Sequence, residues 1–269
     1  MSDTKSDAGP SGTRPEPVLR TSGVSFGYNN VPVVRDLSLT VGAGEVVALL
    51  GANGAGKTTT LLGLAGVMRP FGGAVVLAGH PAPHTLHRRA RRGLSFVPSE
   101  RPVVRSLTVR DNLRIGRGGV DKAVAIFPEL GRLLDRKAGL VSGGEQQMLT
   151  LARALAVEPA IVLADELSLG LAPLIVHRLL EVLRGFADQG VGVLLVEQQI
   201  GYALESADHV YVMRRGEIAM QGPVVQMRER VDEIEACYFS TVDAPDASGS
   251  AQGETAEARP AAATAVAGE

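Results

Sequence analysis

The stretch VVALLGANGAGKTTT, residues 46–60, decides the fold of this chain. Residues 46–50 form a short apolar run, typical of a strand that is buried on both faces of a sheet. The run breaks at Gly51, and a helical pattern begins at Lys57. Gly51-x4-Gly56-Lys57-Thr58 is the P-loop pattern, and a strand before it with a helix after it is the context that gives the pattern meaning.

A loop of this composition can hold phosphate groups. Glycines let the backbone wrap closely, so that its N–H groups point at phosphate oxygens beside the positive end of a helix. Lys57 adds a full positive charge, and the Thr58 hydroxyl is placed to ligate Mg²⁺. The stretch therefore predicts that the chain binds a nucleoside triphosphate. The expected contacts come from the loop and the first helical turn: Gly51, Asn53, Gly54, Ala55, Gly56, Lys57, Thr58 and Thr59.

Length and composition exclude several classes of protein. The chain has 269 residues, which suit one large α/β domain or two closely joined subdomains. Its net charge of −2 gives no reason to expect nucleic acid or an anionic membrane surface as a partner. No apolar run approaches the ~20 residues that a membrane span needs. The single cysteine, Cys237, cannot form an internal disulfide, which suits a reducing compartment.

Composition also divides the chain into tails and a folded part. Residues 1–17 and 241–269 are rich in small and polar residues and are predicted to be disordered, which leaves residues 18–240 as the folded domain. Residues 18–41 alternate apolar and polar positions around Asn29-Asn30, which indicates antiparallel strands joined by a turn. Residues from about 99 to 141 interrupt the alternation of strands and helices and are predicted to form a small helical insertion.

Two features of the first hundred residues allow more than one interpretation. Tyr28 is either an ordinary aromatic residue at a strand end or a face on which an adenine ring stacks. A run of arginines could suggest a nucleic-acid patch, but no aromatic residue interleaves it, so we interpret it as a solvated helix face and expect no nucleic-acid partner. The run comprises Arg88, Arg89, Arg91 and Arg92.

A second buried strand, residues 161–166 (IVLADE), ends in two carboxylates. Sheets of this class place ligand-contacting groups at such strand ends. Asp165 can hold Mg²⁺, directly or through water. Glu166 can orient and polarise the attacking water.

Residues 141–147, VSGGEQQ, precede a strong helical pattern. Ser142, Gly143 and Gly144 place hydrogen-bond donors at a helix N-terminus, which predicts a second anion-binding end far from the P-loop in sequence. A simple N-cap is the alternative interpretation. The polar residues of the first helical turn, among them Glu145, favour the anion-binding interpretation.

Taken together, these motifs resemble the ATP-binding subunit of an ABC transporter. The resemblance runs from about residue 18 to residue 240, with GANGAGKTT as the Walker A loop, VSGGEQQ as the signature and IVLADE as the Walker B strand. SGGEQQM, SLGLAP and LLVEQ resemble more narrowly the second ATPase subunit of branched-chain amino acid importers, a group with urea and amide uptake relatives. The resemblance implies a P-loop NTPase (RecA-like) core sheet, an N-terminal antiparallel β subdomain and an inserted α-helical subdomain.

The resemblance also implies roles, cofactors and partners. ATP and Mg²⁺ would bind with Tyr28 on adenine, Lys57 on the β- and γ-phosphates, and Thr58 and Asp165 on the metal, beside Glu166 as the catalytic carboxylate. The signature residues Ser142, Gly143, Gly144 and Glu145 would complete the site of a facing subunit. The implied partners are two transmembrane permease subunits, a second ATPase subunit, which is either a homologue or a second copy of this chain, and, indirectly, a solute-binding protein. The implied location is the cytoplasmic face of the cell membrane.

Four positions depart from the usual pattern of the superfamily. Ser99 stands at the site of a metal-contacting Gln, so Glu100 substitutes for it or the contact is lost. Leu167 replaces a Pro, Ala172 replaces an Asp that communicates across the dimer, and Gln198 replaces a switch histidine that contacts the γ-phosphate. Ala172 and Gln198 agree with the importer branch. Ser99 and Leu167 put hydrolysis rate and coupling in doubt more than ATP binding.

Three functions are consistent with these residues. The first is a transport ATPase that couples ATP hydrolysis to import of a small polar solute. Branched-chain amino acids are the favoured solute, and urea or amides are the alternative. The second is a soluble ABC ATPase of translation or DNA repair, which usually carries two motif sets or a long coiled-coil insertion, and this chain has neither. The third is a regulatory partner that binds ATP but hydrolyses it poorly.

Overall fold

The computed structural model describes residues 16–239. Residues 1–15 and 240–269, which hold nearly all of the two predicted tails, lie outside the described residues, and the first strand, β1 (Pro17–Tyr28), begins one residue inside the predicted N-terminal tail. Among the described helices, none is both long and apolar enough to cross a membrane.

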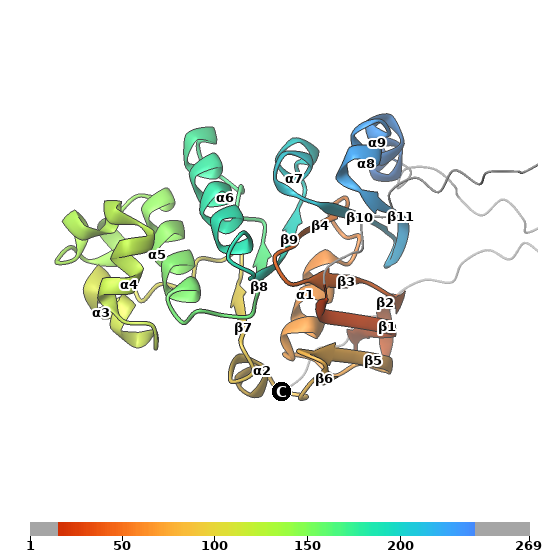
Figure 1. Ribbon diagram of the computed structural model, residues 1–269, viewed down its shortest axis with the longest axis horizontal. Coiled ribbons are helices and arrows are strands. Elements are labelled where there is room, and N and C mark those ends of the chain that lie inside the picture. The colour runs from red at the N-terminus through yellow and green to blue at the C-terminus, as the bar shows by residue number, and fades with distance from the viewer. Residues whose placement is uncertain (1–15, 240–269) are drawn as a thin grey trace, which may run out of the picture. The chain divides into compact units, whose positions relative to one another are not determined.

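A six-stranded sheet forms the centre of the fold (Figure 1). Its order is β11-β10-β4-β9-β8-β7, and all neighbouring pairs are parallel except β10 with β11. The strands are β4 (Val46–Leu50), β7 (Leu94–Val97), β8 (Ile161–Asp165), β9 (Gly192–Glu197), β10 (His209–Arg214) and β11 (Glu217–Pro223). The predicted α/β class with a P-loop core sheet is confirmed.

The predicted antiparallel part is a second sheet of five strands. Asn29 and Asn30 join β1 to β2 with φ of 50° and 62°, the left-handed pair that a two-residue hairpin turn requires and that Asn tolerates. Besides β1 the sheet contains β2 (Val31–Leu37), β3 (Thr40–Gly42), β5 (Gly72–Leu77) and β6 (His80–Pro81).

The side chains of the parallel sheet alternate between two hydrophobic cores. Along β4, Val46, Ala48 and Leu50 belong to one core, whereas Val47 and Leu49 belong to the other. The helix α1 (Lys57–Ala65) contributes to the second core, which it shares with β1 of the antiparallel sheet. The helices α5 (Gly143–Leu155) and α6 (Pro173–Ala187) contribute to the first. The two helices that follow the predicted phosphate-binding motifs, α1 and α5, therefore pack on opposite faces of one sheet.

The interruption predicted around residues 99–141 contains four short helices. They do not build a core of their own, since their buried side chains, such as Leu113 and Phe127, join the core of α5. The helices are α3 (Val109–Ile115), α4 (Val120–Ile126) and the 3-10 helices η1 (Pro128–Leu133) and η2 (Ala138–Leu140). Three further helices belong to the C-terminal part of the described chain: α7 (Ile200–Ser206), α8 (Val224–Arg228) and α9 (Val231–Phe239).

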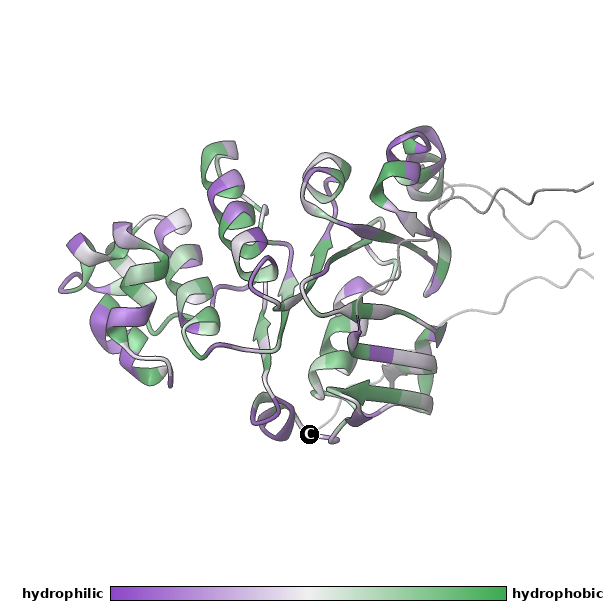
Figure 2. Ribbon diagram, in the orientation of Figure 1, coloured by the Kyte–Doolittle hydropathy of each residue, from purple (hydrophilic) through white to green (hydrophobic). Residues whose placement is uncertain are grey.

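The prediction of a solvated arginine face was wrong for one residue. The helix α2 (Leu86–Ala90) is strongly hydrophilic (Figure 2), but Arg89 within it is only 1 % exposed. Its guanidinium donates hydrogen bonds to the carbonyls of Gly63 and Leu64 in the last turn of α1 and to that of Pro83. Helix C-termini leave carbonyls unsatisfied and carry partial negative charge, so a cation is stabilised there even though burial lowers the pKa of Arg89 to about 10.

Gly63 lets α1 lie against the ring of Phe26 in β1. A Cβ atom at Gly63 would come within 2.5 Å of three ring carbons, whereas a Cβ at Gly185, in α6, would meet nothing within 4 Å. We expect Gly63→Ala to lower the free energy of unfolding by about 1–3 kcal/mol through overpacking. Gly185→Ala, the matched control, is expected to raise it by about 0.5–1 kcal/mol through helix propensity. Urea unfolding midpoints measure both, and equal effects would contradict this packing.

Candidate nucleotide-binding site

The P-loop is a tight turn between β4 and α1. Gly51 follows β4, and a Cβ atom there would lie 2.6 Å from the backbone oxygen of Met213, so that only glycine fits. Gly54 and Gly56 have φ of 80° and 106°, which residues with a side chain rarely adopt. The loop shapes a hollow of about 180 Å³ that is lined by Val33, Asn53, Gly54, Gly56, Lys57, Thr58, Thr59 and Glu166.

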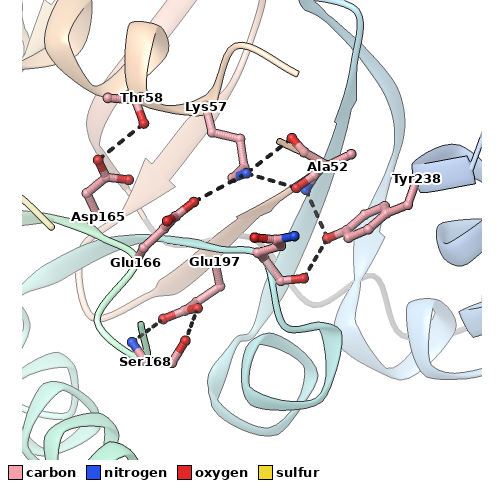
Figure 3. A network of polar contacts seen from close by, with 10 residues as sticks. Ala52, Lys57, Thr58, Asp165, Glu166, Ser168, Glu197 and Tyr238 are labelled. Carbon is pink, nitrogen blue, oxygen red and sulfur yellow. Dashed lines mark hydrogen bonds and ion pairs between the residues drawn. The ribbon is translucent and has the colours of Figure 1, made fainter. Parts of the chain in front are cut away.

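Lys57 is turned back onto its own loop (Figure 3). Its ammonium group donates to the carbonyl oxygens of Gly51 at 2.9 Å and Ala52 at 3.3 Å. It also forms an ion pair with Glu166, with Nζ 3.5 Å from Oε1. The side chain is 4 % exposed, so this pair is screened little by solvent.

Asp165 ends β8 directly beside the first turn of α1. The Thr58 hydroxyl donates to its Oδ2 over 3.3 Å, whereas Oδ1 is buried and has no hydrogen-bond partner. Burial, reinforced by the negative charge of Glu166, raises the pKa of Asp165 to about 6. A buried carboxylate with one unsatisfied oxygen next to an exposed hydroxyl is a suitable partial ligand set for a hard cation such as Mg²⁺.

Glu166 has an unusual backbone conformation for a residue with a long side chain. Its φ is 44°, in the left-handed region, and its N–H donates to the carbonyl of Val196 on β9. Such a conformation costs of order 1–3 kcal/mol and is concentrated at functional sites. The structure thus brings the predicted residues Lys57, Thr58, Asp165 and Glu166 into one cluster.

The remaining predicted residues lie elsewhere. Ser142 is the N-cap of α5: its hydroxyl accepts from the N–H of Glu145, and the Glu145 carboxylate accepts from the N–H of Ser142. This capping box satisfies two otherwise free donors. Gly143 and Gly144 form the first turn of α5 beside Arg101 and Ile175. Tyr28, with half of its surface exposed, ends β1 and is not among the residues that line the P-loop hollow.

Comparison with known proteins identifies the family. A profile described as "ABC transporter" matches residues 34–168. The chain is 39% identical over 211 residues to the high-affinity branched-chain amino acid transport ATP-binding protein BraG of Pseudomonas aeruginosa. The aligned region covers 73% of this chain and 89% of BraG. The chain belongs to the ABC transporter ATP-binding proteins. Its ATP binding and its ATPase class follow from this membership.

Other relatives widen the choice of transport system. The probable branched-chain amino acid transport ATP-binding protein LivF of Archaeoglobus fulgidus is 32% identical over 84% of this chain and 100% of LivF. The lipopolysaccharide export system ATP-binding protein LptB of Escherichia coli is 33% identical over 76% of this chain and 90% of LptB. The solved structure of a nucleotide-free ATP-binding cassette from an ABC transporter has the same fold, with a TM-score of 0.75 and 24% sequence identity. The match covers 83% of this chain and 99% of that cassette.

The positions that depart from the usual ABC pattern have distinct surroundings. Leu167 is buried in the core that contains α5, so an apolar side chain occupies the site of the usual Pro. Ala172 is the N-cap residue of α6 and offers no side-chain cap there. Ser99 and Glu100 lie in the loop after β7, the first half-buried and the second exposed. Gln198 directly follows β9 and is exposed.

Sequence reasoning missed Tyr238, in α9 of this ATPase. Its hydroxyl accepts from the N–H of Gly51 at 3.0 Å and donates to the carbonyl of Gln198 at 3.2 Å, as Figure 3 shows. Burial raises the pKa of Tyr238 to about 12, so the hydroxyl keeps its proton at neutral pH. Nothing in the sequence pointed to this contact, because 187 positions separate Tyr238 from Gly51.

Glu197 was also missed. It is completely buried at the end of β9 and accepts from both the N–H and the hydroxyl of Ser168, at 3.1 and 2.6 Å. Burial raises the pKa of Glu197 in spite of these hydrogen bonds. Glu197 thereby fixes the loop that follows Asp165 and Glu166 to the strand that precedes Gln198.

The raised pKa of Asp165 predicts a stability difference that depends on pH. At pH values between 3.8, the ordinary pKa of an Asp, and about 6, Asp165 keeps its proton in the folded protein but loses it in the unfolded chain. The stability of the folded protein therefore falls as the pH rises through this range, and the loss is complete above pH 6. Without nucleotide or Mg²⁺ at pH 8, Asp165→Asn is expected to be more stable than the unsubstituted protein by about 1–3 kcal/mol. The advantage should shrink as the pH falls through 6 and vanish near 4. Urea unfolding measures it, and a pH-independent difference would contradict the burial argument.

The Tyr238 contact predicts an effect on turnover. Tyr238→Phe removes one hydroxyl between Gly51 and Gln198 and is expected to lower kcat for ATP about three- to tenfold. Tyr211→Phe is the control, because the Tyr211 hydroxyl accepts from the N–H of Thr40, outside the P-loop cluster. Both variants should lose roughly 1 kcal/mol of stability. An unchanged kcat in Tyr238→Phe, or an equal loss in Tyr211→Phe, would show that Tyr238 has no specific role in the site.

Proposed function

We propose that this ABC ATPase is the energy-coupling subunit of an importer for branched-chain amino acids. The similarity to BraG and LivF supports the solute class, together with the segments SGGEQQM, SLGLAP and LLVEQ. In this proposal the chain sits at the cytoplasmic face of the membrane, where it couples ATP hydrolysis to movement of the solute.

The observation that carries the mechanism is the position of the two phosphate-binding motifs. The P-loop helix α1 and the signature helix α5 pack on opposite faces of the parallel sheet (Figure 1). A triphosphate on the P-loop therefore leaves the signature helix of the same chain free. We infer that Ser142, Gly143, Gly144 and Glu145 complete the ATP site of a facing subunit, and that two ATP molecules lie between two such subunits.

The residues of the P-loop cluster would then act on the triphosphate. Tyr28 would stack on adenine, while the loop from Gly51 to Thr59 surrounds the phosphates. Lys57 would exchange the carbonyl oxygens of Gly51 and Ala52 for phosphate oxygens, which are stronger acceptors.

Thr58 and Asp165 would hold Mg²⁺. Their fit to the ion rests on the unsatisfied Oδ1 of Asp165 and the adjacent hydroxyl. The described residues contain no group of three His, Cys, Asp or Glu side chains that could hold a metal by themselves. Phosphate oxygens and water would supply the other ligands, as is usual for Mg²⁺. When bound, the ion neutralises charge on the phosphates.

Hydrolysis requires a base beside the γ-phosphate. Glu166 would orient the attacking water and accept its proton, once Lys57 has turned to the phosphates and released the Glu166 carboxylate. Gln198, in the switch position, would contact the γ-phosphate, and its backbone is held by Tyr238. Closure over ATP would bring the two subunits together, and hydrolysis would separate them.

The partners in this proposal are two transmembrane permease subunits, a second homologous ATPase and, through the permease, a solute-binding protein. The short helices of residues 99–141 would face the permease. A hollow of about 730 Å³ lies there, between the core sheet and the helical segment. Leu86 and Arg91 of the α2 region, Phe96 of β7, Lys122 of α4 and Arg153 of α5 are among the residues that line it.

Lipopolysaccharide export is the second candidate, since LptB is 33% identical to this chain. The membrane proteins that co-purify with a tagged copy after gentle detergent extraction distinguish the two. Import would be supported by recovery of two hydrophobic permease-like subunits and a second ATPase. It would also require that cells without this chain lose uptake of branched-chain amino acids. Export components, or ribosomes and DNA-repair proteins without a membrane subunit, would contradict it.

The two-subunit site predicts that ATP traps a dimer when hydrolysis is blocked. Glu166→Gln keeps the shape of the side chain but cannot accept the proton, so ATP should remain bound and hold two chains together. Gel filtration of this variant with saturating Mg·ATP is expected to show a dimer. The double variant Lys57→Ala/Glu166→Gln is the control and should stay monomeric. A monomer in both cases, alone and after addition of the second ATPase that co-purifies with the chain, would contradict the facing arrangement.

A further inference from the structure

Arg101 connects three segments on the signature side of the molecule. It lies in the loop after β7, and its Nε donates to Oε1 of Gln147 in α5 over 3.2 Å. Its Nη2 donates to the carbonyl of Leu169, in the loop after Glu166, over 2.6 Å. Its Nη1 lies beside Gly143 so closely that a Cβ atom at Gly143 would approach it to 3.0 Å. Glycine at that position therefore admits the guanidinium to the first turn of α5.

The positive charge of Arg101 is not neutralised within the described chain. Arg110 and Arg178 each have a carboxylate partner at about 3 Å, but no Asp or Glu among the described residues forms an ion pair with Arg101. Two of its five N–H groups are used by Gln147 and Leu169. An uncompensated guanidinium at the positive end of a helix is an arrangement that favours a bound anion.

A buried hydrogen-bond donor without an acceptor also lies beside Arg101. Gln147 is 1 % exposed, and its Nε2 has no acceptor. The first turn of α5 adds N–H groups that have no acceptor within the helix. The backbone at Arg101 is strained as well, with φ of 50°. A strained arginine beside one buried, unsatisfied donor and the first turn of a helix is suited to a ligand that only accepts hydrogen bonds, as phosphate oxygens do.

We propose that Arg101 binds the γ-phosphate of the ATP held by the facing subunit, as a second cation opposite that subunit's Lys57. This inference rests on the two-subunit site proposed above and adds a residue to it. Because the same guanidinium contacts Leu169, it would also transmit ATP binding at the signature to the loop behind Glu166 of its own chain. The loop that has Ser99 in place of the usual Gln would thus supply its charge to the other subunit's nucleotide.

The test compares Arg101 variants in the Glu166→Gln background. Arg101→Ala is expected to raise the protein concentration for half-maximal dimerisation with Mg·ATP about tenfold or more, the loss expected for a charged hydrogen bond. ATP binding to the isolated chain should stay unchanged, because the P-loop of that chain is intact. Arg101→Lys keeps the charge without the planar fork and should fall in between. Arg105→Ala, an exposed arginine of the same loop, is the matched control and should behave like the parent.

The outcomes separate this inference from the proposed function. If Glu166→Gln itself never dimerises with ATP, the two-subunit site fails and the inference fails with it. If Glu166→Gln dimerises and Arg101→Ala dimerises equally well, only the role of Arg101 is overturned. Weaker ATP binding by the isolated Arg101→Ala chain would also overturn it, because that result would place the effect in the chain's own site.

Mixed dimers in the same background show which subunit Arg101 serves. Pairing a Lys57→Ala chain with an Arg101→Ala chain leaves one complete site if Arg101 acts on the facing subunit. Pairing the double variant Lys57→Ala/Arg101→Ala with a chain that carries neither change leaves none. Differently tagged chains allow the ATP retained by each mixed dimer to be counted. Retention by the first pairing alone is the expected result, and retention by the second alone would contradict the proposal.

Discussion

The site depends on a balance of charge at the end of β8. Asp165 and Glu166 place two carboxylates side by side in a largely buried position, which costs free energy unless a cation is near. Lys57 forms an ion pair with Glu166, with its Nζ 3.5 Å from Oε1, but Oδ1 of Asp165 has no hydrogen-bond partner. The side chains of this cluster thus carry two negative charges and one positive charge. In the function proposed above, Mg²⁺ would bind beside Asp165 and the phosphates would draw Lys57 away from Glu166, which would leave that carboxylate available as a base.

Segments far apart in the chain hold this site together through single polar contacts. Tyr238 ties the start of the P-loop to the residue after β9, and Glu197 ties the loop after Glu166 to the end of the same strand. Arg101 joins the loop after β7 to the signature helix and to the carbonyl of Leu169. In the function proposed above, these contacts would link the segments around the nucleotide to one another, so that a change at one motif would reach the others without repacking the core.

Much of this architecture could be predicted from the sequence, because it follows from local patterns. The apolar run of residues 46–50, the glycine loop after it and the IVLADE strand are continuous in sequence, and parallel strands bring their carboxyl ends to one edge. Tyr238 and Arg101 escaped prediction because their roles depend on which segments meet in space. Arg89 was misjudged for the same reason: an arginine among three others suggests a solvated face, and only the fold places the end of α1 over it.

In the proposed arrangement, one ATP is bound by the P-loop of one chain and the signature helix of another. A structure of the Glu166→Gln variant with Mg·ATP tests it most directly. Two facing chains are expected, with each triphosphate between Lys57 and Thr58 of one chain and Ser142 and Gly144 of the other. ATP bound by a single chain, with the signature helices of both chains open to solvent, would contradict it.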